Sequence, residues 1–332
     1  MPVLFEFRRY RLPFLRPART AHGLWAEREG LLIRIERADG SLGYGEAAPI
    51  PWFGTETTDE AEAAARELGS RIELDYLGRI PPKLACLRHA LASALAPIRT
   101  EPPKHPTLGV AALLPAGLDA LVSAEIKGEA GFRIFKWKVG VQEADKELGW
   151  LDELCSVLPK GAKLRLDANG AWDRRRAERW LERCSERPVE FVEQPVPPEA
   201  GDLLRGLADN FPVPIGLDES IACDADIERW IGAGWRGVYV VKPTLLADAD
   251  DSLARLAKAR ARVVFSSALE SSVAARSALE AAFFWNGEPL ALGFGVWPLY
   301  EDPRFDGPAA LPFLSWDEVA RMNPEAAWNA AI

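Results

Sequence analysis

Four charged residues each stand at the end of a short apolar run, and the runs follow one another at nearly constant spacing. They are Asp167, Glu193, Asp218 and Lys242, separated by 26, 25 and 24 residues. That length accommodates one buried strand, one helix and two loops, so the spacing predicts successive β/α units. In a parallel barrel the carboxyl ends of all strands meet at one rim, and the four side chains would share one site there.

Three of these side chains are carboxylates, the hard oxygen ligands that Mg²⁺ prefers. A single Asp after a strand is commonly a helix N-cap. Three acids in register, each closing an apolar strand, favour a metal site instead. Asn169, two residues beyond Asp167, would orient a ligand or make a turn. The sequence therefore predicts that Asp167, Glu193 and Asp218 bind Mg²⁺, for which Mn²⁺ can substitute.

Two lysines precede the first of these acids on a predicted strand. Lys136 and Lys138 are two residues apart and so share one face of that strand. Such a pair is ordinarily solvated, but helices cover the outside of a barrel, so both lysines would face the interior. Neighbouring cations and a divalent metal lower a lysine pKa, which suits a general base.

Lys242 would lie across the barrel from Lys138, because strands two and six of an eight-stranded barrel are opposite. A small-molecule carboxylate would then place its α-carbon between the two lysines. This arrangement suits proton abstraction beside a carboxylate, with the metal and one lysine stabilising the enediolate.

Two further segments are candidates for supporting or substrate-binding roles. Ser266 and Ser267 begin a run of small residues, 266–272, whose hydroxyls and amides could hold an anion or simply cap a helix. Phe53 and Gly54 belong to an aromatic loop that could form a lid or a packing contact.

Alternating strand and helix patterns fill the chain from residue 107 onward. This alternation fits an α/β fold with a modified TIM (β/α) barrel. A doubly wound sheet is the rival, but no glycine-rich phosphate loop follows Leu114. The predicted strands are 108–114, 132–139, 163–167, 189–193, 213–218, 237–242, 262–266 and 290–294, and the predicted helices include 143–157, 174–184, 224–232 and 247–259.

The first hundred residues have a different pattern, in which strands come before helices. Strands are predicted at 6–10, 30–36 and 42–46, with a turn at Asp39-Gly40, and helices at 59–68 and 83–95. A proline-rich stretch, 97–106, follows. We therefore predict an α+β capping domain with substrate-specificity loops over 1–103, a catalytic barrel over 104–298, and a segment over 299–332 that packs back on the cap.

The composition excludes several classes of partner. The chain is 48% hydrophobic and 27% charged with a net charge of −9, which argues against nucleic acids and anionic membrane surfaces. No apolar run reaches the length of a membrane span, and the N-terminus turns charged too early for a secretory signal. The four cysteines form no close pair, as is usual in a reducing compartment. We expect a cytoplasmic protein; no pattern indicates its oligomeric state.

Six short motifs bring these residues together: Gly43-Tyr44-Gly45-Glu46-Ala47-Ala48-Pro49, Lys136-x-Lys138, Asp167-Ala168-Asn169, Glu193-Gln194-Pro195, Asp218-Glu219-Ser220 and Lys242-Pro243. With these motifs the chain resembles the enolase superfamily, and within it the muconate-lactonizing subgroup. The resemblance implies a capped barrel in which Lys138 removes the α-proton and returns it to a departing hydroxyl. It also implies that Lys242 stabilises the enediolate beside a metal held by the three acids.

Within this subgroup the chain is most similar to the o-succinylbenzoate synthase family, through segments 10–14, 49–54 and 266–272. That similarity implies syn dehydration of 2-succinyl-6-hydroxy-2,4-cyclohexadiene-1-carboxylate for menaquinone or phylloquinone synthesis. N-acylamino acid racemase and dipeptide epimerase are the main alternatives. Dipeptide epimerases typically carry Asp-x-Asp after the last strand, and residues 292–297 contain no acid. Muconate cycloisomerase and a non-catalytic binding barrel are further alternatives.

Overall fold

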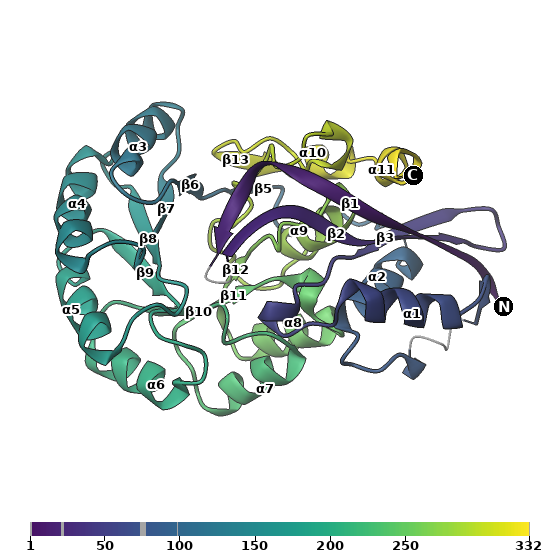
Figure 1. The fold of residues 1–332 in the computed structure, drawn as a ribbon, viewed down its shortest axis with the longest axis horizontal. Helices are drawn as coiled ribbons and strands as arrows, with labels where there is room; N and C mark the ends of the chain where they lie inside the picture. Colours follow the sequence, from purple (N-terminus) through teal and green to yellow (C-terminus); the bar gives the residue numbers. More distant parts are fainter. Residues whose placement is uncertain (1, 21–22, 74–77, 98, 332) are drawn as a thin grey trace.

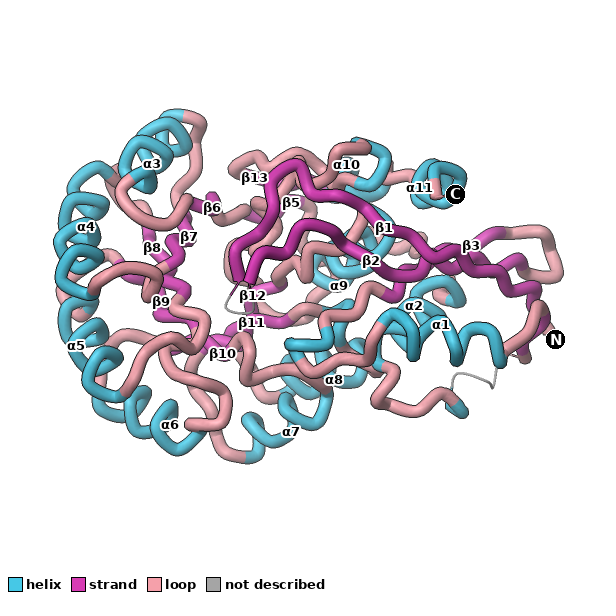
Figure 2. The backbone as a smooth tube through the Cα atoms, in the orientation of Figure 1, coloured by secondary structure: helices cyan, strands magenta, loops and turns pink. Residues whose placement is uncertain are grey.

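The computed structural model describes residues 2–20, 23–73, 78–97 and 99–331. A parallel sheet curls into a barrel with helices on its outside, and an antiparallel sheet with two helices lies beside it (Figures 1 and 2). The predicted fold class, a modified TIM barrel with an N-terminal α+β cap, is confirmed.

The cap is built on a long antiparallel hairpin. Strands β1 (Val3–Thr20) and β2 (Gly23–Glu36) pair along most of their length, and both extend beyond the predicted strands. Strand β3 (Leu42–Ala47) adds to β2, and the short β4 (Arg71–Ile72) adds to β1, which gives the order β3-β2-β1-β4. Helices α1 (Thr58–Glu67) and α2 (Ala85–Leu95) pack on this sheet through a buried apolar cluster.

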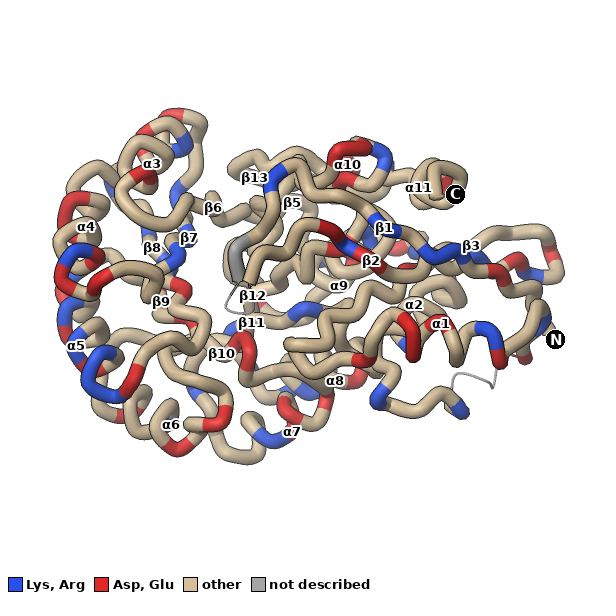
Figure 3. The backbone as a smooth tube through the Cα atoms, in the orientation of Figure 1, with Lys and Arg blue, Asp and Glu red and all other residues tan. Residues whose placement is uncertain are grey.

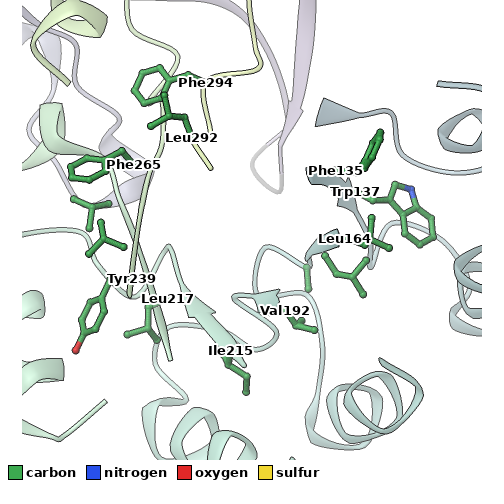
Figure 4. Close-up of a cluster of buried hydrophobic side chains, with 14 of the residues drawn as sticks. Phe135, Trp137, Leu164, Val192, Ile215, Leu217, Tyr239, Phe265, Leu292 and Phe294 are labelled. Carbon is green, nitrogen blue, oxygen red and sulfur yellow. The ribbon is translucent and has the colours of Figure 1, made fainter. Parts of the chain in front are cut away.

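Seven parallel strands form the barrel sheet, in the chain order β6 to β12. Their apolar side chains alternate between the interior and the covering helices, as Phe135 and Trp137 of β7 show by packing outward in the main core (Figure 4). The strands are β6 (Ala112–Leu114), β7 (Ile134–Lys138), β8 (Lys163–Asp167), β9 (Val189–Glu193), β10 (Ile215–Leu217), β11 (Val238–Val241) and β12 (Arg262–Phe265).

The barrel is closed by an irregular segment where the sequence predicted strand 290–294. Leu292 bridges Val110 and Gly293 bridges Ser266, with the Leu292 N–H 2.7 Å from the Gly109 oxygen. These are isolated bridges, so the prediction of a regular strand is wrong. Pro289 has no N–H to donate, and Gly293 lies so close to Ser266 that a Cβ there would be 2.6 Å from the serine Oγ.

Helices follow the strands and cover the outside of the barrel, and charged residues of both signs mark their outer turns (Figure 3). The helical segments predicted at 174–184 and 224–232 agree with α5 and α7. The covering helices are α3 (Asp119–Glu129), α4 (Ala144–Val157), α5 (Arg174–Cys184), α6 (Gly201–Asn210), α7 (Asp224–Gly232), α8 (Ala249–Lys258) and α9 (Ser272–Phe283).

The predicted first barrel strand, 108–114, is divided between two sheets. Its first part is β5 (Thr107–Gly109), which pairs with β13 (Phe313–Ser315) near the C-terminus, and its second part is β6. Beyond β13 lie α10 (Trp316–Ala320) and α11 (Pro324–Ala330), and Trp328 of α11 belongs to a buried cluster that includes Tyr10 and Phe14 of β1. The predicted domain boundaries remain a prediction.

None of the helices formed by the described residues has both the length and the apolar character needed to cross a membrane.

Candidate active site

The carboxyl ends of β7 to β11 bring the predicted chemical residues to one rim. The register pairs Lys138 of β7 with Asp167 of β8, and Asp167 in turn with Glu193 of β9. Asp218 follows β10 directly, and Lys242 follows β11. Because β7 and β11 are four places apart in a ring closed by an eighth segment, Lys138 and Lys242 lie on opposite sides of it.

The three acids are buried although each carries an ionisable group. Asp167, Glu193 and Asp218 are 7%, 1% and 6% exposed. Burial and the neighbouring charge of Asp167 raise the pKa of Glu193 well above its ordinary value. Burial also opposes ionisation of Asp167, but the Lys136 ammonium outweighs it and lowers the pKa of that carboxyl. The cluster therefore needs positive charge among its carboxylates.

Two lysines supply that charge in this structure. The Lys136 Nζ lies 3.0 Å from Asp167 Oδ2 and 2.6 Å from Glu193 Oε1, and Lys242 pairs with Asp218. Burial lowers the Lys136 pKa, but the three carboxylates outweigh it and raise that pKa. Lys136 thus serves as a charged partner of the acids. The expectation of a lowered lysine pKa, which includes a bound divalent metal, stays a prediction.

Lys138 shares the interior face of β7 with Lys136, since the two are separated by one residue whose side chain packs outward. Its charge acts on Asp167 and helps to lower the pKa of that carboxyl. The structure thus places Lys138 at the rim beside the first acid. Its role as the base remains a prediction.

The carboxylate oxygens of the three acids are the type of ligand that a hard divalent cation prefers. No three acidic, histidine or cysteine side chains of the described residues form a ready metal cluster, and the Lys136 ammonium lies between Asp167 and Glu193. However, two buried oxygen atoms nearby, Asn169 Oδ1 and Glu219 Oε2, have no hydrogen-bond partner among the described residues. Buried acids with unsatisfied oxygens beside them fit Mg²⁺, which binds carboxylates and keeps water ligands.

Asn169 and Gln194 hold the acids in place. The Asn169 N–H donates to Asp167 Oδ1 at 3.1 Å, and its side-chain amide donates to Glu219 at 2.9 Å. Asn169 has a φ of 45°, which asparagine tolerates better than most residues. The fully buried Gln194 accepts from the N–H groups of Asp218 and Ser220, both at 3.1 Å. Gln194 was not predicted as a site residue, although it lies in the Glu193-Gln194-Pro195 motif.

The two predicted serines differ in what their hydroxyls contact. The Ser267 hydroxyl donates to Glu270 at 3.0 Å and accepts from the Leu269 N–H at 2.9 Å, so the protein itself engages it. Ser266 follows β12 and faces Gly293, and its hydroxyl makes no hydrogen bond among the described residues. Of the two hydroxyls, that of Ser266 is therefore the better placed to contact a ligand. Both assignments remain predictions.

The cap brings an aromatic side chain to the rim. Phe53 ends a short 3₁₀ turn, Pro51–Phe53, and the Lys242 Nζ lies 4.4 Å from its ring centroid. Gly54 has a φ of 101° and approaches Ala222, which follows β10. Phe53 and Gly54 thus lie against the β10 and β11 ends of the barrel.

A buried polar contact between cap and barrel was missed as well. Glu46 of β3 accepts from the N–H groups of Ser271 and Ala274 at the start of α9, both at 3.0 Å. It also accepts from Tyr10 and Ser271 hydroxyls, both at 2.5 Å. Its burial could not be predicted because these partners are 225 or more residues away, apart from Tyr10.

Comparisons with known proteins agree with this geometry. Residues 121–284 match the model for the enolase C-terminal domain-like family, and residues 5–76 match that for the MenC N-terminal domain. An o-succinylbenzoate synthase of Thermosynechococcus vestitus is 38% identical over 88% of this chain and 92% of its own. One from Yersinia enterocolitica is 31% identical over 80% and 81%.

Solved structures give the same result. The o-succinylbenzoate synthase of Thermosynechococcus elongatus BP-1, complexed with Mg in its active site, superimposes with a TM-score of 0.82 at 35% identity and covers 98% of this chain and 99% of its own. The L-Ala-D/L-Glu epimerase of Bacillus subtilis reaches 0.83 over 95% and 96%, but at 20% identity it shows only the fold.

A capped parallel barrel with lysines and acids at successive strand ends defines an enzyme of the enolase superfamily. Within that class, the extent of identity decides the family. The chain belongs to the o-succinylbenzoate synthase family.

Proposed function

We propose that this enzyme is a Mg²⁺-dependent o-succinylbenzoate synthase, a hydro-lyase that dehydrates 2-succinyl-6-hydroxy-2,4-cyclohexadiene-1-carboxylate. The observation that carries the proposal is the 38% identity to an o-succinylbenzoate synthase across 92% of that relative. The proposal is supported by the lysines and acids that end or follow β7 to β11 at one rim of the barrel.

Asp167, Glu193 and Asp218 would hold the metal, and Mn²⁺ is proposed to substitute for Mg²⁺. When bound, the cation supplies Lewis acidity that favours negative charge on carboxylate oxygens. The three acids are buried and adjacent, so their own charges make a divalent cation favourable.

Lys138 is proposed to break the α C–H bond by accepting the proton on its Nζ. The electron pair moves onto the substrate carboxylate, where the Lys242 ammonium stabilises the negative charge from the opposite side. The pair then returns to expel the ring hydroxyl, and Lys138 gives its proton to that group so that water leaves. Lys136 is proposed to act as a charged neighbour of the acids and not as the base, because its Nζ lies 3.0 Å from Asp167 Oδ2 and 2.6 Å from Glu193 Oε1.

The ring becomes aromatic when water leaves, so elimination is strongly downhill from the enediolate. The N-acylamino acid racemase and dipeptide epimerase alternatives use the same barrel but no structural feature favours them over dehydration. The segment that closes the barrel, 289–293, and the residues up to 297 contain no acid that could hold a substrate ammonium group.

The test is conversion of the cyclohexadiene substrate, followed by the loss of diene absorbance. We expect Lys138→Ala to abolish turnover while Mg²⁺ binding, measured by calorimetry, stays largely intact. Lys163→Ala is the matched control, because Lys163 is exposed at the start of β8, the opposite end of the barrel, and should leave turnover unchanged. Full activity in Lys138→Ala would refute the assignment of the base.

The cytoplasmic location and a small-molecule partner belong to the same proposal.

A further inference from the structure

Phe53 belongs to the cap, and its ring contacts Lys242, which follows strand β11 of the barrel. The Lys242 Nζ lies 4.4 Å from the centroid of the Phe53 ring, within the range of a cation–π interaction. The lysine side chain is only 12% exposed and its ammonium also pairs with Asp218. The ring and the acid are therefore its two identified partners in a largely desolvated place, where cation–π attraction is strongest.

The loop that carries Phe53 is held rigidly by the cap. Arg28 is 1% exposed and donates to the carbonyl oxygens of Ala48 and Pro49, just before the turn. The Ile50 N–H donates to Thr55 Oγ1 at 2.7 Å and the Phe53 N–H to the Ile50 oxygen at 2.8 Å. Arg28 also donates to the Leu269 oxygen, which ties the cap to the loop after β12.

A ring differs from a carboxylate in what it does to the ammonium. It attracts and orients the cation through its quadrupole but adds no negative charge that would offset it. Asp218 is also a proposed Mg²⁺ ligand, so the ring is the Lys242 partner that does not compete for the metal. A free lysine side chain has many rotamers, and restricting them before the substrate binds favours the transition state.

We propose that Phe53 is a positioning residue that holds the Lys242 ammonium toward the substrate carboxylate, so that the cap takes part in catalysis through a lysine and not only by covering the site. This inference rests on the proposed function for its kinetic consequence. The contact itself is independent of that function.

The first test compares Phe53→Leu, which keeps apolar volume but removes the ring, with Phe53→Tyr, which keeps the ring face. We expect Phe53→Leu to lower kcat about five- to thirty-fold with KM changed less than about two-fold, the range of a partly desolvated cation–π contact. Phe53→Tyr should retain kcat within about two-fold. Trp52→Leu is the control. Trp52 lies on the same loop as Phe53 but contacts Trp25 of β2, so its substitution should leave kcat unchanged.

The second test does not depend on turnover. In protein labelled with ¹³Cε-lysine, the Lys242 Hε signal, assigned by its loss in Lys242→Arg, should lie upfield in the wild type and in Phe53→Tyr relative to Phe53→Leu. Ring current over the side chain causes that shift.

Three results would overturn the proposal. An increase in KM alone in Phe53→Leu would mean that the ring contacts substrate. Equal losses in Phe53→Leu and Phe53→Tyr would mean that it only packs. An unshifted Lys242 signal would mean that the contact does not exist. If the wild type failed to dehydrate the substrate, the proposed function would fall, and the Lys242 signal would still decide whether Phe53 positions the lysine.

Discussion

The buried carboxylate of Glu46 is expected to be a large contributor to the stability of the folded protein. It is 1% exposed and accepts four hydrogen bonds, from Tyr10, from the Ser271 hydroxyl and from the N–H groups of Ser271 and Ala274. The perturbation is Glu46→Ala. It removes the carboxylate that accepts from two backbone N–H groups at the start of α9.

The loss of stability depends on which of the four donors to Glu46 can form other hydrogen bonds in Glu46→Ala. The two hydroxyls can rotate, but the two N–H groups are fixed by the helix, and each unsatisfied group costs about 1 to 2 kcal/mol. Loss of a negative charge at the N-terminus of α9 adds about 1 kcal/mol. We therefore expect the free energy of unfolding to fall by about 3 kcal/mol or more.

The assay is urea unfolding followed by circular dichroism, with Glu6→Ala as the matched control. Glu6 lies on the same sheet but is exposed and forms a surface ion pair with Arg34, so its loss should cost less than about 1 kcal/mol. Glu46→Gln keeps one acceptor and should fall between the two. A loss below about 1 kcal/mol in Glu46→Ala would refute the reasoning, since it would mean that water or a shifted backbone replaces the carboxylate without cost.

Three further predictions concern pH, a loop and the metal. Burial lowers the pKa of His89 from 6.5 to about 4, so below pH 6.5 the unfolded chain binds a proton that the folded protein does not. Between pH 7 and pH 4.5 the free energy of unfolding should therefore fall by about 2 kcal/mol more in the wild type than in His89→Gln. Equal falls in the two proteins, measured by urea unfolding, would contradict this. Glu147 is 1% exposed and accepts from three N–H groups of the loop just after Lys138, those of Gly140, Val141 and Gln142. Glu147→Ala should therefore lower the free energy of unfolding in urea by about 2 to 4 kcal/mol and lower kcat. Unchanged stability would show that this loop keeps its conformation without the carboxylate. Mg²⁺ at one hundred times its Kd should stabilise the wild type by about 2.7 kcal/mol. Gln194→Ala removes the acceptor of the Asp218 N–H and should weaken Mg²⁺ binding, measured by calorimetry, about ten- to one-hundred-fold. Equal affinity in the two proteins would show that Gln194 does not order the loop that carries Asp218.

The strands that deliver the site were predictable because their signals are local. Runs such as 163–167 and 189–193 are of strand length, carry apolar residues directly before a final acid, and agree with β8 and β9 as observed. The irregular structure of 290–294 could not be predicted from local signals. Pro289 and Gly293 disrupt regular pairing, and the segment is placed by isolated bridges to residues beside β6 and in or beside β12. The first barrel strand was misjudged since β5 pairs with β13, about 200 residues later.

The sequence by itself determined which residues reach the rim, because strand periodicity and the spacing of β/α units depend only on neighbours along the chain. Only the tertiary structure decided what each of them contacts. Lys136 became a charged partner of Asp167 and Glu193, the Ser267 hydroxyl was taken up by Glu270, and Phe53 came to lie on Lys242. Those contacts join segments up to about 190 residues apart, and burial then sets the charge and freedom of each side chain, which no local pattern encodes.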